Sequence, residues 1–472
     1  MTTFSMAGTA VLPPTVVTPV DPHGYWTRDR VARALGGGPR GAQPFGGIST
    51  DTRQVTVGDL FVALRGDRYD AHDFLAEARD RGASALVVSD ASRAVGLGLP
   101  VYVVPDTLVA LGQLATAWRR AWGRTVIAVG GSNGKTSTKE LLKAALSPTL
   151  AVHATVGNLN NLIGVPLTLL AIPSDAELAI VEVGTNTPGE IERLRAIVEP
   201  DVAVVTSLGE EHLEGLGDLA GVLREESALF EAVPLAIVAA AYPDLITAAT
   251  ARAGTVRTAG LESADEQPSA WGLEPDGRPW LEVDGARGVL PVRGAHQAAN
   301  AMLAIAVARV CGVPIDSALA GMAAMTVPSM RGVLEQIGEL TLYNDAYNAN
   351  PASMRAALTL LGQMGGDRPR VAILGTMREL GAHAEAQHRE IAQAALASGA
   401  TLIAAMGDFV AAFTAIAPDD PRVVLADDLE GLWAQLAPRL PRHAVILLKG
   451  SRGVQLERLV PHLTAWASPT SV

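Results

Sequence analysis

The residues whose types and spacing best suit chemistry lie in Thr125–Leu142, TVIAVGGSNGKTSTKELL. A β-branched stretch leads into a glycine-rich turn, then Lys135-Thr136 and a helix-forming sequence. Such a turn points backbone N–H groups at phosphate oxygens, and the following helix adds its positive dipole end. Lys135 can reach the β- and γ-phosphates, and the Thr136 hydroxyl can hold Mg²⁺. The segment predicts an ATP-type site, although Val129 replaces the first glycine of the strict pattern; the alternative is a glycine-rich turn with a chance lysine.

Lysine is rare in this chain, and its positions are therefore informative. Only four of the 37 basic residues are lysines: Lys135, Lys139, Lys143 and Lys449. In a chain that otherwise uses arginine, a retained lysine indicates a need for its compact ammonium. We expect such a need at Lys135 and at Lys449 in VILLKGSRG. Lys139 and Lys143, four residues apart, instead predict a solvent-exposed helix face.

Acidic and histidine side chains follow the next strand-like stretches. Glu182 ends LAIVEV, and a carboxylate at the carboxyl end of a parallel strand can hold Mg²⁺ in the ligand crevice. His212, in SLGEEHLEGLG, belongs on the same edge as a ligand or as a packed or capping residue. A carboxylate of Glu225-Glu226 in the next helix can return to the same pocket. Glu182 alone is equally consistent with a solvated turn.

Two asparagine-rich segments, TVGNLNNLIGVP and NDAYNANPASMRAAL, offer paired hydrogen-bond donors and acceptors. They contain Asn158, Asn160 and Asn161, and then Asp345, Tyr347, Asn348 and Asn350. The first segment suits an amide-rich substrate or an ordered loop with Asx turns. In the second, Asn350-Pro351 is a helix-capping signal, which can be the whole role of these polar residues.

The elements that must position these residues alternate strand with helix, which predicts an α/β protein of three units. Residues 25–123 form a small α/β unit, and residues 124–327 carry buried strands at 125–129, 178–183, 202–206 and 236–240. WGLEPDGRPWLEV, with Asp276-Gly277 as its turn, predicts a hairpin. Residues 328–472 repeat the pattern as a Rossmann-like sheet with strands at LTLYND, RVAILG, TLIAAMG, RVVLAD and HAVILLKG. Residues 1–24 are expected to be a flexible lead-in.

Composition limits the function classes. The 472 residues carry a formal net charge of −12 and no basic run, which argues against a nucleic-acid partner. The one cysteine, Cys311, excludes an internal disulfide, suits a reducing cytoplasm and lies in an apolar run that predicts a packed core thiol. No apolar run approaches about 20 residues, so we expect no membrane span.

Nine segments of this chain recur, in the same order, in one enzyme family. They are ISTDTRQVTVGDLFVALRGDRYDAHDF, GGSNGKTSTKE, GNLNNLIGVPLTLL, IVEVGTNTPGEI, LGEEHLEGLGDLAGV, GAHQAANAMLAIA, NDAYNANPASMRAAL, LGTMRELG and LLKGSRG. They resemble the Mur ligase family, the ATP-dependent amide-forming enzymes of peptidoglycan assembly. The resemblance implies three domains: an N-terminal one for the UDP-sugar, a central ATPase and a C-terminal Rossmann-like one. We expect the chain to be a monomer.

The resemblance also implies a reaction. ATP phosphorylates a peptide carboxylate, and an amine attacks the resulting acyl phosphate. GNLNN and DAYNANP favour the member that joins D-alanyl-D-alanine to UDP-N-acetylmuramoyl-tripeptide. The alternatives are a sister Mur or folylpolyglutamate-type ligase with another amine, and a non-catalytic homologue that binds UDP-peptide or ATP.

Carried over by motif, the resemblance implies the following roles. ATP contacts Gly131, Ser132, Asn133, Gly134, Lys135, Thr136, Ser137, Asn300, Arg331 and Asp345. Magnesium is served by Thr136, Glu182, His212 and Glu226, and the catalytic set is Lys135, Glu182, His212 and Glu226. The substrates contact Ser49, Thr50, Asp51, Arg53, Asn158, Asn160, Asn161, Tyr347, Asn348 and Asn350.

Two residues depart from the family's pattern. Glu226 stands where the family has a lysine carbamylated by CO₂, and we expect its carboxylate to replace the carbamate directly. Thr376 stands in LGTMRELG where the family commonly has Asp, so no site role is assigned to that loop.

Overall fold

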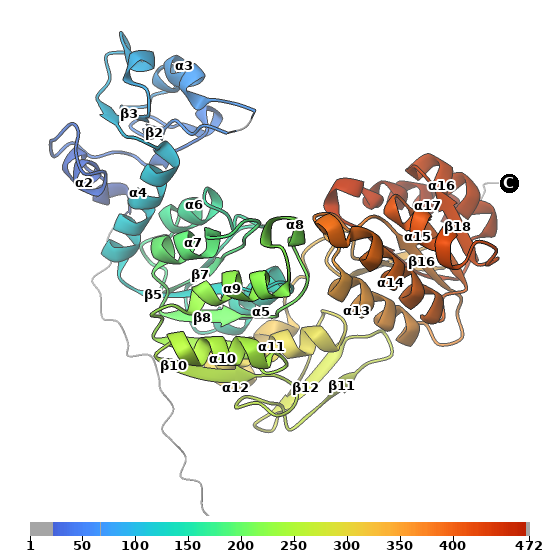
Figure 1. Cartoon of the computed structure of the whole chain (residues 1–472). Helices are drawn as coiled ribbons and strands as arrows, with labels where there is room; N and C mark the ends of the chain where they lie inside the picture. The colour runs from blue at the N-terminus through green and yellow to red at the C-terminus, as the bar shows by residue number, and fades with distance from the viewer. Residues whose placement is uncertain (1–21, 67, 469–472) are drawn as a thin grey trace, which may run out of the picture.

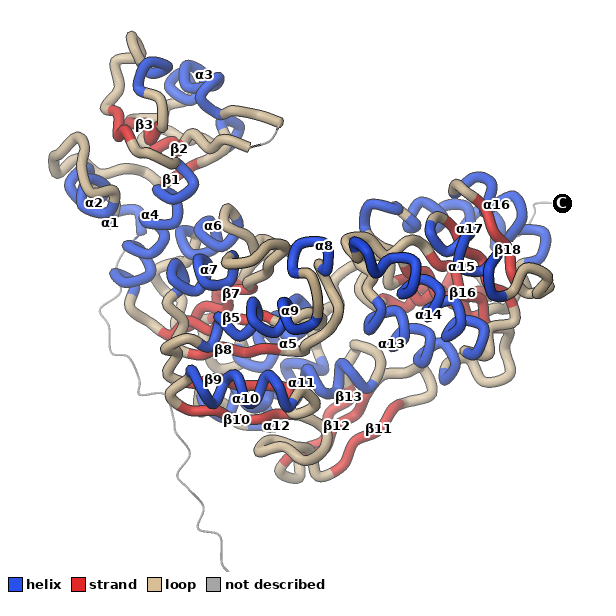
Figure 2. Tube along the Cα trace, viewed as in Figure 1, coloured by secondary structure: helices blue, strands red, loops and turns tan. Residues whose placement is uncertain are grey.

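The computed structural model describes residues 22–66 and 68–468, which form three α/β units in a row (Figure 1). Helices lie on the outer faces of the sheets in each unit (Figure 2). Of the expected lead-in, residues 1–21 lie outside the described residues, and Pro22–Tyr25 form the short helix α1. In the part of the chain that is described, no helix is long and apolar enough to cross a membrane.

The N-terminal unit is a parallel four-stranded sheet. Its strands in spatial order are β1 (Ile48–Ser49), β2 (Leu60–Val62), β3 (Ala85–Val88) and β4 (Val101–Val103). After α1, its helices are α2 (Arg28–Ala34), α3 (Leu75–Asp80) and α4 (Thr107–Trp122). Asp106 caps α4 by accepting from the Leu108 N–H at 2.7 Å, and Gly123 ends the helix with a φ of 66°.

The central unit is built on a six-stranded sheet whose strands all run parallel. In spatial order they are β10 (Thr255–Ala259), β9 (Leu235–Ala239), β8 (Val202–Val205), β5 (Thr125–Gly130), β7 (Leu178–Glu182) and β6 (Val152–Ala154). The four strands expected from sequence are present, with ends shifted by at most one residue. From β5 the chain runs to the edge strand β6, comes back to β7 beside β5, and then crosses to the other side of β5 at β8. Strand β5 is therefore a switch point, and α/β sheets form their ligand crevice at such points.

Helices cover both faces of the central sheet. One face carries α5 (Lys135–Leu146), α11 (Ala295–Val310) and α12 (Ile315–Ala323). The other carries α6 (Gly164–Leu170), α7 (Glu190–Val198), α9 (Leu219–Ser227) and α10 (Pro243–Arg252), with α8 (Leu213–Leu216) beyond its edge. Residues 301–308 of helix α11 are all buried because a second, antiparallel sheet also packs against this helix.

That small sheet consists of β11 (Ala270–Leu273), β12 (Pro279–Val283) and β13 (Ala286–Val289). The β11–β12 pair is the predicted hairpin, with Asp276-Gly277 in its turn. Cys311 follows α11 half-buried beside this core, and burial raises the pKa of its thiol to about 12. These surroundings agree with the prediction of a packed, unreactive thiol.

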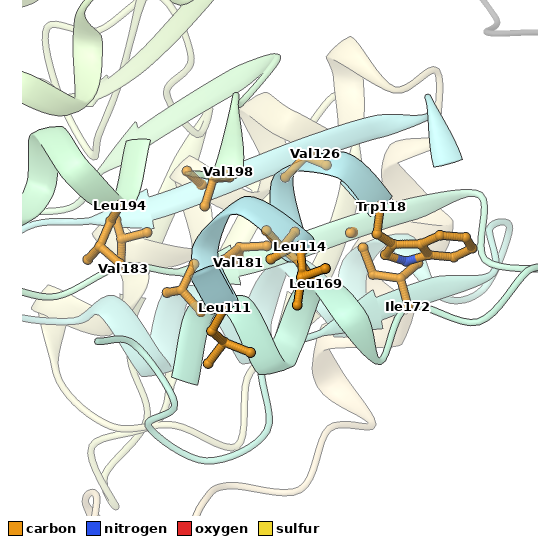
Figure 3. Close-up of a cluster of buried hydrophobic side chains, with 14 of the residues drawn as sticks. Leu111, Leu114, Trp118, Val126, Leu169, Ile172, Val181, Val183, Leu194 and Val198 are labelled. Carbon is orange, nitrogen blue, oxygen red and sulfur yellow. The ribbon is translucent and has the colours of Figure 1, made fainter. Parts of the chain in front are cut away.

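Helix α4 fastens the N-terminal unit to the central one (Figure 3). Leu111, Leu114 and Trp118 of α4 pack against Val126 of β5 and Leu169 of α6 within one buried cluster. The burial of these side chains supplies most of the driving force for this contact. The sheet of the N-terminal unit itself stands away from the central unit, joined to it through α4 (Figure 1).

The C-terminal unit is a second six-stranded sheet, parallel except for one edge. In spatial order its strands are β14 (Val333–Ile337), β15 (Leu340–Asn344), β19 (Val445–Lys449), β16 (Arg370–Leu374), β17 (Leu402–Met406) and β18 (Val423–Ala426). One face carries α13 (Pro351–Gln363), α14 (Ala384–Ala397) and α15 (Asp408–Ile416), and the other α16 (Leu429–Leu436) and α17 (Leu459–Ala467). All five strands predicted for this unit are present, and the antiparallel edge strand β14 is an addition.

Candidate active site

A cavity of 880 Å³ opens at the carboxyl edge of the central sheet, and the C-terminal unit provides part of its wall. Most residues that the sequence nominated for ATP, metal or peptide line it. These are Ser132, Asn133, Gly134, Lys135, Thr136, Ser137, Asn158, Asn160, Asn161, Glu182, His212, Asn300, Arg331, Asp345, Tyr347 and Asn348. Seven nominated residues are absent from the described lining: Gly131, Glu226, Asn350, Ser49, Thr50, Asp51 and Arg53.

The turn after β5 is held open by hydrogen bonds to the end of β8. The Ser132 N–H donates to the Ser207 carbonyl at 3.0 Å, and the Asn133 N–H donates to Ser207 Oγ at 2.7 Å. Gly131 has a φ of 114°, and a Cβ there would lie 2.4 Å from Thr206 Oγ1. Only glycine fits at this position. The turn is thus preformed, and residues 134–137 at the start of α5 face the cavity.

Lys135 folds back over this turn. Its Nζ donates to the Gly131 carbonyl at 2.6 Å and lies 3.5 Å from Glu211 Oε1. Burial alone would lower the pKa of Lys135, but the charges of Glu211, Glu226 and Glu182 outweigh burial and raise it. The ammonium therefore stays charged in a pocket of carboxylates. Glu211 is a buried cavity residue that was not among the residues nominated from the sequence.

Glu182 joins three segments around the cavity. Its Oε1 accepts from Thr136 Oγ1 and from Asn160 Nδ2, each at 3.0 Å. Its backbone N–H donates to Thr155 Oγ1 at 2.9 Å. The side chain is buried, and among the described residues Oε2 has no hydrogen-bond partner. A buried carboxylate oxygen without a donor is suited to a cation.

Glu226 lies against the turn rather than in the cavity wall. Its Oε2 accepts from the Gly131 N–H at 2.7 Å, and its Oε1 has no hydrogen-bond partner in residues 22–66 and 68–468. Burial raises the pKa of Glu226 to about 7, and the nearby Glu211 adds to this while Lys135 opposes it. One carboxylate oxygen thus fixes the glycine turn, and the other is left available.

His212 connects the central and C-terminal units. Its Nδ1 pairs with the Glu379 carboxylate, and its Nε2 lies 3.8 Å from Glu211 Oε2. Burial lowers the pKa of His212, but the hydrogen bond to Glu379 and the charge of Glu211 outweigh it and raise the pKa. The neighbouring Glu214 N–H donates to the Glu379 carbonyl at 3.1 Å, which strengthens the same contact.

The described residues contain no group of three or more His, Cys, Asp and Glu side chains arranged to hold a metal. Magnesium, however, is usually bound by one or two carboxylates together with waters and substrate phosphates. Glu182 Oε2 has no hydrogen-bond partner among the described residues and lies 3.7 Å from Lys139 Nζ, while Oε1 accepts from the Thr136 hydroxyl; this carboxylate and hydroxyl together fit that mode of binding. The residues present therefore suit a cation that arrives with a nucleotide.

Asp345 and Lys449 form the cavity wall on the C-terminal side. Lys449 is 2% exposed, and its Nζ donates to Asp345 Oδ2 at 2.6 Å and to the Asn348 carbonyl at 3.0 Å. The Arg331 guanidinium lies 3.8 Å from the centre of the Tyr347 ring, which is a cation–π contact. The burial and hydrogen bonds of Lys449 agree with the expectation that this position needs the compact ammonium of lysine.

Asn350 has two structural duties. It caps α13 by accepting from the Ser353 N–H at 2.9 Å, and its Nδ2 donates to Asn133 Oδ1 at 2.7 Å. The second bond ties the C-terminal unit directly to the phosphate-binding turn. Asn161 forms an Asx turn just before α6, because its Oδ1 accepts from the N–H groups of Ile163 and Gly164. The first asparagine-rich segment therefore combines an Asx turn with cavity lining.

The structure does not bring the four N-terminal residues to this cavity. Ser49 ends β1, and its Oγ donates to the Asp51 carbonyl at 3.1 Å. Asp51 is paired with Arg53, whose Nη2 lies 2.6 Å from Asp51 Oδ2. Thr376 likewise stays outside the cavity wall, where its Oγ1 accepts from the Asp408 N–H at 3.0 Å.

The expectation of an exposed Lys139 is wrong. Lys143 is exposed, but Lys139 is fully buried beneath the segment that follows β6. Helical spacing describes only the surface of α5 itself, whereas a segment distant in sequence covers Lys139. The scarcity of lysine in this chain was the signal that could have identified it.

Comparison with known proteins adds independent findings. Three family models match this chain: the Mur ligase family catalytic domain over residues 44–119, the Mur ligase middle domain over 129–308, and the Mur ligase glutamate ligase domain over 331–452. The UDP-N-acetylmuramoyl-tripeptide–D-alanyl-D-alanine ligase of Escherichia coli K12 is 36% identical over 428 residues, which is 88% of this chain and 92% of that sequence.

Solved structures agree with these matches. A crystal structure of MurF from Acinetobacter baumannii aligns with a TM-score of 0.85 and 30% identity, over 93% of this chain and 99% of that one. MurF ligase from Thermotoga maritima in complex with ADP aligns with a TM-score of 0.79 and 25% identity, over 89% of this chain and 97% of that one.

Proposed function

The chain belongs to the Mur ligase family, and we propose that it joins D-alanyl-D-alanine to UDP-N-acetylmuramoyl-tripeptide at the expense of ATP. The observation that carries this proposal is the composition of the 880 Å³ cavity. A phosphate-binding turn, a buried carboxylate at a strand end and two asparagine-rich segments meet there. Relatives that match 88% of this chain carry this activity in their names.

The reaction requires activation of a carboxylate, which is a poor electrophile. Transfer of the γ-phosphoryl group forms an acyl phosphate and ADP. The D-alanyl-D-alanine amine then attacks the acyl carbon, a tetrahedral intermediate forms, and inorganic phosphate leaves as the amide bond closes and the amine proton is lost. Two anions must come together in this sequence, so positioning and charge neutralisation are the main tasks of the protein.

The residues of the turn perform the nucleotide part of this task. Lys135 releases the Gly131 carbonyl and turns toward the β- and γ-phosphates, while the N-terminus of α5 faces them. Asn300, which lies against Gly134, belongs near the adenine. Arg331 and Asp345 complete the ATP site from the C-terminal side. The ADP complex of the Thermotoga maritima relative supports nucleotide binding by this fold.

Magnesium, when bound, would neutralise phosphate charge during transfer. Thr136 and Glu182 would hold it, with His212 as a further ligand and Glu226 behind the turn. Glu226 supplies a carboxylate directly, so turnover needs no bicarbonate. A large bicarbonate requirement in CO₂-depleted buffer would refute this assignment.

The remaining contacts belong to the other substrates. Asn158, Asn160 and Asn161 face the peptide stem, and Tyr347 and Asn348 approach the incoming dipeptide from the C-terminal unit. Asn350 supports that side through its bond to Asn133. The residues Ser49, Thr50, Asp51 and Arg53 hold the UDP portion in the N-terminal unit, whose sheet stands apart from the cavity. The domain limits are 25–123, 124–327 and 328–472, and the enzyme works as a monomer in the cytoplasm without a nucleic-acid partner.

The test is phosphate release from ATP and Mg²⁺ with UDP-N-acetylmuramoyl-tripeptide, with and without D-alanyl-D-alanine, and mass detection of the pentapeptide. We expect release and product only when both substrates are present. Product with another amine in place of the dipeptide would indicate a sister ligase. Binding of both ligands without release would indicate a non-catalytic homologue.

A further inference from the structure

Lys139 is a fully buried cation beside the active site, and the reaction scheme above does not use it. Its Nζ donates to the Thr155 carbonyl at 2.8 Å and to the Gly157 carbonyl at 2.9 Å. It also lies 3.0 Å from Glu140 Oε1. The ammonium thus donates two hydrogen bonds to carbonyl oxygens and forms an ion pair with a neighbouring carboxylate. Burying a charge is costly unless it is compensated in this way, so the position is specific.

These contacts connect two parts of the site that are far apart in sequence. Lys139 lies on α5, one turn after Lys135-Thr136, and its two carbonyl partners begin the segment 155–163. That segment carries Asn158 and Asn160 into the cavity. The two hydrogen bonds from Lys139 therefore fix the position and direction of the asparagine-rich segment where it leaves β6.

Lys139 also lies near the buried end of Glu182. Its Nζ is 3.7 Å from Glu182 Oε2, the oxygen that has no hydrogen-bond partner among the described residues. Oε1 of the same carboxylate accepts from Asn160 at 3.0 Å. Lys139 thus acts on the segment at both ends, through the carbonyls at its start and through Glu182 at Asn160. The residue itself is not part of the described cavity wall.

We propose that Lys139 is a positioning residue for the UDP-peptide substrate, which holds residues 155–161 in the shape that presents Asn158 and Asn160. The proposal rests on the proposed function for the identity of the substrate. It predicts a selective defect, because the Lys139 side chain donates its hydrogen bonds to Thr155 and Gly157 and, among the described residues, none to residues 131–137 of the phosphate-binding turn. Arginine is not expected to replace it, because the larger planar guanidinium does not fit where the compact ammonium is fully buried.

The test compares Lys139→Met with Lys143→Met, an exposed position one turn further along α5. Loss of two charge-assisted hydrogen bonds is expected to raise the KM for UDP-N-acetylmuramoyl-tripeptide by about tenfold or more, with the KM for ATP changed less than about threefold. Lys143→Met is expected to match the wild type. Lys139→Arg is expected to share the selective KM defect, and it serves as the test if the Met variant does not fold.

Calorimetry separates this proposal from the proposed function. The dissociation constant of UDP-N-acetylmuramoyl-tripeptide, measured without turnover, should rise about tenfold in Lys139→Met while that of ADP stays within about threefold. Equal losses for both ligands, or no loss for either, would overturn the positioning role. A wild-type enzyme that binds both ligands but forms no product would instead contradict the proposed function and leave the binding comparison intact.

Discussion

Replacing Glu226 by glutamine should make the protein more stable at high pH and less active. The carboxylate is fully buried, and its pKa rises from 4.5 to about 7. Between these two pH values the folded state keeps the Glu226 proton, whereas the unfolded state has already released it. The free energy of unfolding therefore falls as the pH rises through this window. At 1.36 kcal/mol per pKa unit the loss above pH 7 is about 3 kcal/mol.

Glutamine removes this cost and keeps an oxygen for the Gly131 N–H. It also removes one of the carboxylates that balance Lys135, which offsets part of the gain. We therefore expect a net stabilisation of about 1–3 kcal/mol at pH 8 and almost none at pH 4.5. Turnover should fall about 100-fold, because a neutral amide cannot balance the cations of the site.

The assay is thermal unfolding of Glu226→Gln and wild type across pH 4.5–8, with the transition of the central unit followed separately. The matched control is Glu225→Gln, since the Glu225 carboxylate accepts from the Gly189 and Ile191 N–H groups at 2.7 and 2.8 Å. The Thr185 hydroxyl also donates to this carboxylate, so glutamine keeps one acceptor oxygen for three donors, and the control should lose stability across the pH range tested. A Glu226→Gln variant that is destabilised equally at pH 4.5 and pH 8 would refute the reasoning.

Three further substitutions test other contacts. Asn350→Ala removes a helix cap and the bond to Asn133, so unfolding of the C-terminal unit should cost about 1 kcal/mol less and the KM for ATP should rise; an unchanged KM would contradict the link. Glu182→Gln should raise the Mg²⁺ concentration for half-maximal activity about tenfold, as a magnesium titration at saturating ATP would show. Trp118→Ala should destabilise the contact between α4 and the central sheet by about 3–5 kcal/mol in thermal unfolding, and a loss below 1 kcal/mol would contradict the packing in Figure 3.

The sequence was most informative where structure is local or fully buried. Strands such as β5 and β7 are continuous apolar runs because helices cover both of their faces, so their ends could be placed within one residue. The hairpin turn at Asp276-Gly277 and the cap at Asn350 were predictable because their chemistry lies within a few residues. The glycine-rich turn before Lys135 was predictable for the same reason, because its glycines and Lys135 lie within a few residues of one another.

The strands that were missed, β6, β10, β13 and β14, all lie at the edges of their sheets. They are only partly buried, so they lack the apolar run that marks a central strand. Their conformation depends on the neighbouring strand rather than on their own composition. Periodicity within a single segment carries no information of that kind.

Contacts between distant segments were the other limit. Lys139 is covered by residues 155–157, and Glu211 pairs with Lys135, 76 residues earlier in the chain. The pairing of His212 with Glu379 and of Asn133 with Asn350 depends on how the C-terminal unit meets the central one. No local pattern encodes that geometry. A resemblance across nine segments could nominate these residues, but only the fold shows what each one contacts.

The most direct test of the central claim is an isotope transfer experiment. UDP-N-acetylmuramoyl-tripeptide carrying ¹⁸O in its terminal carboxylate is incubated with ATP, Mg²⁺ and D-alanyl-D-alanine, and the phosphate released is examined by mass spectrometry. An acyl-phosphate route predicts one carboxylate oxygen in each phosphate formed with the pentapeptide. Unlabelled phosphate accompanying pentapeptide would contradict the account.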